Sequence, residues 1–133
     1  MPNTAKAVGT AWERRIADYA AERGLPWDRA PLRGVNDLLD LSGTLPDGWL
    51  VGGKGITRKG NLADRMSDAM NQCRTAMANL RRIYPGAAGD VIAVQIIQRQ
   101  GFPTGRAYAV MEYDEFLSLV LQRREWRGRR EAG

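Results

Sequence analysis

The sequence predicts an α/β fold in which helices flank a single mixed β-sheet. Residues 62–84 carry apolar side chains at helical spacing, Met66, Cys73 and Leu80 among them, as in an amphipathic helix. Residues 91–97 form a near-continuous apolar run, which is typical of a strand covered on both faces. Shorter runs surround these segments, and nothing resembles a long linker. We therefore expect one layered domain over residues 1–133.

The first half of the chain is expected to hold one helix and three short strands. Trp12, Ile16 and Tyr19 recur at helical spacing, so residues 4–23 should form a helix, and Gly24 stops it. The strands are predicted at 27–32, at 38–42 and from residue 49 onward. Pro-Asp-Gly at 46–48 is a turn sequence, so the last two strands should form a hairpin.

The second half begins with the long helix, for which Asn61 is a plausible N-cap. Strands are predicted at 91–97 and 106–113, and a last helix at about 114–127. Four large apolar residues fall on one side of that helix: Phe116, Leu117, Val120 and Leu121. The basic tail from about residue 127 could fray.

Composition excludes several classes of protein. The chain has no histidine, which excludes Ser-His-Asp triads and His-ligated zinc sites, and a single cysteine excludes a disulfide framework. No apolar run reaches the ~20 residues of a membrane span, and no secretory pattern is present, so we expect a cytoplasmic protein. Twenty Lys and Arg against fifteen Asp and Glu give a net charge of +5, which favours a nucleic-acid partner over mere solubility.

Asp40 and Lys54 are the first candidates for chemistry. Asp40 lies between two leucines of a predicted strand, and Lys54 ends the next strand. A carboxylate can hold Mg²⁺, and a lysine can stabilise charge that develops on a phosphate, so the pair suits phosphodiester chemistry. An ordinary surface ion pair on an exposed hairpin is the alternative.

Four sequence fragments, in order, carry a resemblance to a known family. They are Gly-Thr-Ala-Trp-Glu at 9–13, Gly-Val-Asn-Asp-Leu-Leu-Asp-Leu-Ser-Gly at 34–43, Gly-Trp-Leu-Val-x-x-Lys at 48–54, and Gly-Arg-Ala-Tyr-Ala-Val-Met at 105–111. With the order of elements, they resemble the compact PD-(D/E)XK nucleases, in particular small phage proteins similar to Holliday junction resolvases. The resemblance covers residues 9–126 and implies a restriction-endonuclease-like αβββαβ core with a further strand and a C-terminal helix.

The resemblance also implies roles for individual residues. Glu13 corresponds to a helix glutamate that helps bind metal, Asp40 to the metal-binding aspartate, and Lys54 to the lysine of the E-x-K element. Gln72 resembles a glutamine that some relatives place beside the active site. The implied cofactor is Mg²⁺, with Mn²⁺ possible.

Position 52 departs from the family pattern. The E-x-K glutamate would fall there, but the residue is Gly52, which offers no ligand atom. Some relatives move this glutamate to the neighbouring helix, where Asp64 and Asp68 are the candidates. At about 100° per residue both lie opposite the apolar face, so we expect them to point to solvent.

The basic residues form two candidate DNA-binding groups. Lys54, Arg58 and Lys59 flank the expected cleft, and Arg123, Arg124 and Arg127 belong to the basic C-terminus. The first hypothesis is a Mg²⁺-dependent, structure-selective DNA endonuclease of the resolvase type, acting on branched DNA as a homodimer. The alternatives are a nuclease-fold protein that binds DNA without cutting it, and a phage protein-interaction module.

Overall fold

The computed structural model describes residues 4–30, 38–56, 61–86 and 89–132 of the chain. It has α/β architecture, with three helices among the described residues: α1 (Thr4–Glu22), α2 (Leu62–Ile83) and α3 (Tyr113–Ala132). The strands are β1 (Asp28–Arg29), β2 (Leu41–Ser42), β3 (Trp49–Lys54), β4 (Ile92–Ile97) and β5 (Tyr108–Val110). Two short 3₁₀ turns, η1 (Leu45–Asp47) and η2 (Thr104–Arg106), precede β3 and β5.

Local sequence signals account for the ends of these elements. Gly24 has a φ of 91°, a left-handed conformation that glycine adopts without strain, and α1 ends just before it. The Asn61 side chain accepts a hydrogen bond of 2.9 Å from the Asp64 backbone N–H, which confirms the expected N-cap of α2. Gly48, with a φ of 85°, turns the chain from η1 into β3.

The strands form two sheets in the described part of the chain, so the expectation of a single sheet is wrong. β3 and β4 are parallel and joined through α2, and β5 pairs with β4 in the antiparallel sense. β1 and β2 form a separate antiparallel pair. Leu39 has a φ of 70°, which interrupts extended structure just before β2. The expected hairpin is correspondingly irregular: the Asp40 N–H donates to the Val51 carbonyl at 3.1 Å, but β2 and β3 form no ladder.

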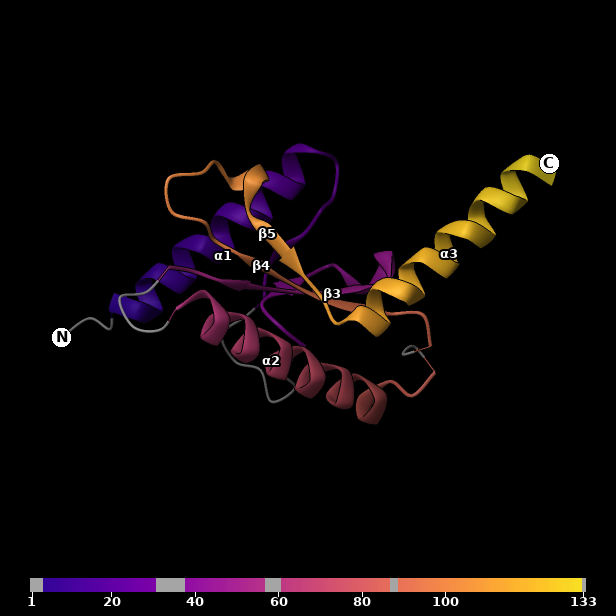
Figure 1. Ribbon diagram of the computed structural model, residues 1–133, viewed down its shortest axis with the longest axis horizontal. Helices are drawn as coiled ribbons and strands as arrows, with labels where there is room; N and C mark the ends of the chain where they lie inside the picture. Colours follow the sequence, from indigo (N-terminus) through magenta and orange to yellow (C-terminus); the bar gives the residue numbers. More distant parts are fainter. Residues whose placement is uncertain (1–3, 31–37, 57–60, 87–88, 133) are drawn as a thin grey trace.

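Helices α1 and α2 cover opposite faces of the β3–β4–β5 sheet (Figure 1). On the α1 face, Trp12, Ile16, Val51 and Val94 belong to one buried cluster. On the α2 face a second cluster is formed by eight buried residues: Leu39, Leu50, Cys73, Ala76, Met77, Leu80, Val91 and Ala93. Successive residues of β3 therefore alternate between α1 and α2, which decides the direction of each candidate side chain at the end of that strand.

Helix α3 projects away from these layers towards the C-terminus (Figure 1). It continues to Ala132, beyond residue 127, where the sequence predicted its end. Its predicted apolar side exists, but Phe116, Leu117, Val120 and Leu121 are all exposed. None of the helices in the described segments combines the length and apolar character required to cross a bilayer.

Candidate functional site

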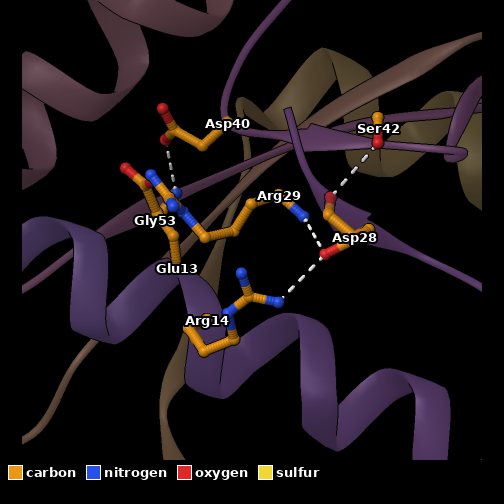
Figure 2. A network of polar contacts seen from close by, with 7 residues as sticks. All are labelled: Glu13, Arg14, Asp28, Arg29, Asp40, Ser42 and Gly53. Atoms are coloured by element: carbon orange, nitrogen blue, oxygen red, sulfur yellow. Dashed lines mark hydrogen bonds and ion pairs between the residues drawn. The ribbon is translucent and has the colours of Figure 1, made fainter. Parts of the chain in front are cut away.

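Glu13 and Asp40 approach each other at the edge of β3. Glu13 belongs to α1, and Asp40 lies in the irregular segment just before β2. One carboxylate oxygen of Asp40, Oδ2, accepts a hydrogen bond of 2.9 Å from the backbone N–H of Gly53. Figure 2 shows the side chains of Glu13, Arg29 and Asp40 gathered around Gly53. Two of the predicted site residues, distant in the sequence, are thus brought together.

Gly53 allows this approach because it has no side chain. A Cβ atom there would lie 3.0 Å from Cδ1 of Ile16 and 3.1 Å from Cδ1 of Trp12, so α1 packs almost directly on the β3 backbone. The indole N–H of Trp12 donates to the Ile96 carbonyl at 2.9 Å and fixes the helix against the sheet. Glu13, the next residue, is therefore held at the sheet edge beside Asp40.

Arg29 completes this cluster, and sequence reasoning missed it. Its Nε donates to Oε2 of Glu13 at 3.2 Å, and the two side chains are only 16% and 18% exposed. Its Nη2 is buried and has no hydrogen-bond partner among the described residues. Arg29 lies in the predicted strand 27–32. Because Asp28 and Arg29 are both charged, the alternation of apolar and polar residues along the strand does not indicate which of the two side chains faces α1.

Next to Arg29, Asp28 anchors the β1 strand to α1. Its Oδ1 accepts hydrogen bonds from Nη1 of Arg14 at 3.2 Å and from the Arg29 backbone N–H at 2.7 Å (Figure 2). The Arg14–Asp28 pair is more than half exposed, so it contributes little energy. β1 lies along α1, and this placement brings the Arg29 guanidinium to Glu13.

The pKa of Glu13 is raised above its ordinary value. Burial is the main cause, because it disfavours the charged carboxylate, and the negative charge of Asp40 acts in the same direction. The hydrogen bond and the positive charge of Arg29 oppose the rise without cancelling it. Repulsion between the two carboxylates, when both are ionised, therefore adds to the effect of burial.

Such a site suits a hard divalent cation. Mg²⁺ prefers oxygen ligands and is often held by one or two carboxylates, with water completing its coordination. Glu13 and Asp40 would supply that donor set, and a cation between them would offset the repulsion by Asp40, which is the second cause of the raised Glu13 pKa after burial. The described residues contain no group of three or more His, Cys, Asp or Glu placed to hold a metal, so they offer no third carboxylate beside these two.

Lys54 follows Gly53 at the end of β3 and is half-buried. It pairs with Ile97 of β4 and, by strand alternation, shares the α2 face of the sheet with Gly52. Among the described residues it forms no ion pair with Glu13 or Asp40. Lys54 is thus one residue from the backbone group that Asp40 contacts, with its side chain on the α2 face.

The space beside Gly52 is filled by Gln95, a residue that sequence reasoning also missed. The two residues are partners in the parallel β3–β4 register, and Gln95 is fully buried. Its Nε2 donates to Oε1 of Gln72 at 3.3 Å and to the Ala69 carbonyl at 3.5 Å, both on α2. Its Oε1 has no hydrogen-bond partner among the described residues. The only feature of the sequence that could have singled out Gln95 is its position as a polar residue inside the apolar run 91–97.

Gln72 therefore lies on the α2 side of the sheet, in contact with Gln95, and not in the Glu13–Asp40 cluster. Asp64 and Asp68 are exposed on α2, as their helical positions predicted. The predicted catalytic set is divided between the two faces of β3: Glu13 lies on the α1 side, and Lys54 and Gln72 on the α2 side. Asp40 lies at the edge between them.

The predicted DNA-binding residues are spread more widely. Arg58 and Lys59 lie outside the described residues. Arg123, Arg124 and Arg127 are exposed on the projecting half of α3. Comparisons with protein-family models, with curated proteins and with solved structures find no match to this chain.

Proposed function

We propose that the protein is a Mg²⁺-dependent DNA endonuclease that acts on branched DNA. The observation that carries the proposal is the meeting of Glu13 and Asp40 at Gly53, beside the lysine that ends β3. Two carboxylates, with a lysine at the end of the same strand, are groups that can support phosphodiester hydrolysis, and the net charge of +5 favours attraction of a DNA backbone. The restriction-endonuclease-like arrangement of the core belongs to the same proposal.

In this proposal each residue has a distinct task. Asp40 and Glu13 would hold the cation, and the Asp40–Gly53 hydrogen bond fixes one carboxylate in place. When bound, a divalent cation neutralises phosphate charge and makes a nearby water more acidic. Lys54 would stabilise the charge that develops on the phosphate as the water oxygen bonds to phosphorus and the bond to the leaving oxygen breaks. Arg29 keeps the Glu13 carboxylate oriented until the cation binds.

Cleavage of a labelled four-way junction and of a linear duplex of the same sequence, each with Mg²⁺, Mn²⁺ or EDTA, tests this proposal. Asp40→Asn is the central variant, because an amide oxygen can still accept the bond from Gly53 while the charge is lost. We expect it to abolish metal-dependent cutting and to leave DNA binding largely intact. Asp68→Asn, on an exposed aspartate of α2, is the matched control and should cut like the wild type.

Gly52 favours a second candidate, a DNA-binding protein that does not cut. The position that would supply a third carboxylate has no side chain, and Gln95 fills the adjoining space. This candidate predicts binding that weakens steeply with salt and is indifferent to Mg²⁺ and to Asp40→Asn. Tight binding without cutting under every metal would therefore favour it over the endonuclease.

A further inference from the structure

The end of β4, the loop that follows it and the start of β5 bring two aromatic rings to one arginine. The guanidinium carbon of Arg99 lies 3.6 Å from the ring centroid of Phe102 and 4.4 Å from that of Tyr108. Nη1 of Arg99 also donates to the Arg106 carbonyl at 3.1 Å. The two aromatic residues are 43% and 41% exposed, so much of their surface is open to solvent. We call Arg99, Phe102 and Tyr108 the aromatic platform.

The backbone on both sides of the aromatic platform is held in place. The Gln98 N–H donates to the Lys54 carbonyl at 2.8 Å, which ties the start of the loop to the end of β3. Further along the loop, Gly105 lies against the hydroxyl of Tyr19, so that η2 packs on α1 (Figure 1). A surface that is ordered before binding loses little conformational entropy when a flat ligand stacks on it. The platform therefore has the rigidity that a binding surface needs.

The aromatic platform shares one face of the sheet with Lys54. Ile97 of β4 pairs with Lys54 of β3 on one side and with Tyr108 of β5 on the other, so the three residues form one row. Residues in register on neighbouring strands point to the same face. The alternate positions of the last strand, Ala107 and Met111, pack into the cluster on the α1 face. Tyr108 is therefore on the α2 face, two strand spacings or about 10 Å from Lys54.

Positive charge surrounds the aromatic platform. No Asp or Glu occurs between residues 91 and 111, whereas Arg99 and Arg106 both belong to this segment. Arg65 of α2 reaches the start of the loop, where its guanidinium donates to the Gln98 carbonyl at 3.3 Å. Within the described parts of the chain, none of these three arginines forms an ion pair. The exposed rings thus lie in a positive field that no carboxylate of the described residues neutralises by direct contact.

Unpaired nucleotides match this combination of groups. A nucleobase stacks on an aromatic ring or on a guanidinium plane, and arginine side chains contact the phosphates on either side of it. A base inside a duplex has both faces covered by its neighbours, so only an unpaired base can stack on the platform. An acidic peptide or an anionic lipid would be attracted by the arginines, but neither brings a base to stack on Phe102 and Tyr108.

We propose that the aromatic platform binds unpaired nucleotides of a DNA strand, with bases stacked on Phe102 and Tyr108 and a neighbouring phosphate held by Arg106. The platform is inferred from its own contacts, but its role in selecting branched DNA rests on the proposed endonuclease. A DNA strand advances about 3.4 Å per nucleotide in a duplex and more when it is extended. A base on the platform would therefore lie within a few nucleotides of a phosphate at Lys54.

Binding of a fluorescently labelled oligothymidylate to the full chain in EDTA tests the proposal without requiring cleavage, with fluorescence anisotropy as the readout. The reference ligand is an oligomer of the same length in which tetrahydrofuran replaces every base, so that it keeps the phosphates and loses the rings. We expect the wild type to bind oligothymidylate at least about fivefold more tightly than this abasic oligomer, because only the former can stack.

Substitution of the two rings should remove this preference. Tyr108→Ala and Phe102→Ala should each raise the dissociation constant for oligothymidylate at least about fivefold and leave that for the abasic oligomer unchanged. Tyr108→Phe keeps the ring and should bind like the wild type. Tyr84→Ala and Phe116→Ala, at exposed aromatic residues outside the loop, are the matched controls and should also bind like the wild type. Circular dichroism confirms that each variant is folded.

The salt dependence of binding separates stacking from charge. Arg106→Ala should weaken the binding of both oligomers and make the slope of log affinity against log salt less steep by about 0.7, the value for one phosphate contact on a single strand. Tyr108→Ala should lower the affinity for oligothymidylate without changing that slope, because a stacked base releases no counterion. A role of Tyr108 that consisted only in positioning the arginines would change the slope.

Three results would overturn the proposal. The first is equal binding of oligothymidylate and of the abasic oligomer by the wild type. The second is equal loss of oligothymidylate binding in Tyr84→Ala and Tyr108→Ala. The third is a Tyr108→Ala variant that binds both oligomers more weakly by the same factor. Junction cleavage by a wild type that does not distinguish the oligomers would leave the proposed endonuclease standing while the platform failed. Base-dependent binding by a protein that cuts no DNA would support the platform and contradict the endonuclease.

Discussion

Gln95 lies against Gly52 across the parallel pair of β3 and β4, in the space that a side chain at position 52 would need. A Cβ atom on Gly52 would be 2.5 Å from Oε1 of Gln95 and 2.8 Å from its Nε2. The amide is held in place by Gln72 and the Ala69 carbonyl, both on α2. The structure therefore leaves no room for the carboxylate that the resemblance would place at position 52, because Gln95 of the neighbouring strand fills that space.

Any side chain at position 52 should consequently destabilise the fold. Gly52→Ala is expected to lower the free energy of unfolding by about 1–3 kcal/mol, because the buried Gln95 amide must shift and lose its bonds to α2. Gly52→Glu should cost at least as much. Denaturant unfolding measures both effects, with Gly86→Ala as the control, since a Cβ atom there meets no atom within 4 Å.

The double variant Gly52→Glu, Gln95→Ala should recover part of that loss, because the alanine makes room for the glutamate. The two changes should therefore be clearly non-additive in the free energy of unfolding. If the effects of the two changes on the free energy of unfolding were strictly additive, Gln95 would not occupy the space that a side chain at position 52 needs. If the carboxylate of the glutamate at position 52 also reaches Asp40 in the double variant, isothermal titration should show tighter Mg²⁺ binding than in the wild type.

The pKa of Glu13 predicts how stability depends on pH. Since this pKa is raised in the folded state, the folded protein retains the proton more readily than the unfolded chain does. Stability contributed by the protonated group is present at low pH and is lost as the pH rises from about 4.5 through the higher folded pKa. Glu13→Gln removes this dependence, so the wild type should lose stability relative to the variant as the pH rises through this window.

Unfolding of the wild type and of Glu13→Gln between pH 4 and pH 8 measures this difference, with the exposed Glu22→Gln as the control. A constant difference across that range would contradict the raised pKa. Mg²⁺ supplies a second readout. A cation held by Glu13 and Asp40 requires both carboxylates to be ionised, so its affinity should increase with pH and its binding should release protons.

Much of the fold could be predicted from the sequence, because its signals are local. The apolar stripe of α2, the Asn61 cap and the apolar run of β4 each depend on residues close together in the chain. The division into two sheets could not be predicted: the left-handed backbone of Leu39 interrupts the expected strand 38–42, and leucine rarely adopts that conformation, so the sequence carries no signal for it.

The candidate site was predictable only in part. The resemblance singled out Glu13 and Asp40, and the structure places them together. It could not indicate Arg29 or Gln95, whose roles depend on which elements become neighbours: β1 beside α1, and β4 beside β3. The exposed apolar face of α3 is a second example. Apolar spacing predicts an amphipathic helix, but it does not indicate whether the apolar face is covered by the rest of the chain.

Cys73 should be unreactive in the folded protein. It is 3% exposed, and burial, aided by the charges of Glu115, Glu112 and Asp40, raises the pKa of its thiol to about 12. The thiolate, which is the reactive form, is therefore almost absent at neutral pH. We expect a thiol-specific reagent to modify Cys73 only as fast as the domain opens. Rapid labelling of the native protein, at a rate close to that in denaturant, would show that α2 is not firmly packed on the sheet.

Trp12 should be the side chain on which the position of Glu13 most depends. It is 2% exposed, packs against Gly53 and donates its indole N–H to the Ile96 carbonyl at 2.9 Å. Trp12→Phe keeps an aromatic ring but loses that bond and part of the volume, so it should lower the free energy of unfolding by about 1–3 kcal/mol.

Trp126→Phe, at a half-exposed tryptophan of α3, is the control for Trp12→Phe and should change stability by less than about 0.5 kcal/mol. The affinity for Mg²⁺ distinguishes a displacement of Glu13 from a general loss of stability in Trp12→Phe. Because Trp12 holds α1 on the sheet beside Asp40, Trp12→Phe should weaken Mg²⁺ binding even under conditions where the variant is fully folded. Unchanged Mg²⁺ affinity in the folded variant would mean that Glu13 is positioned by its ion pair with Arg29 and not by the packing of α1.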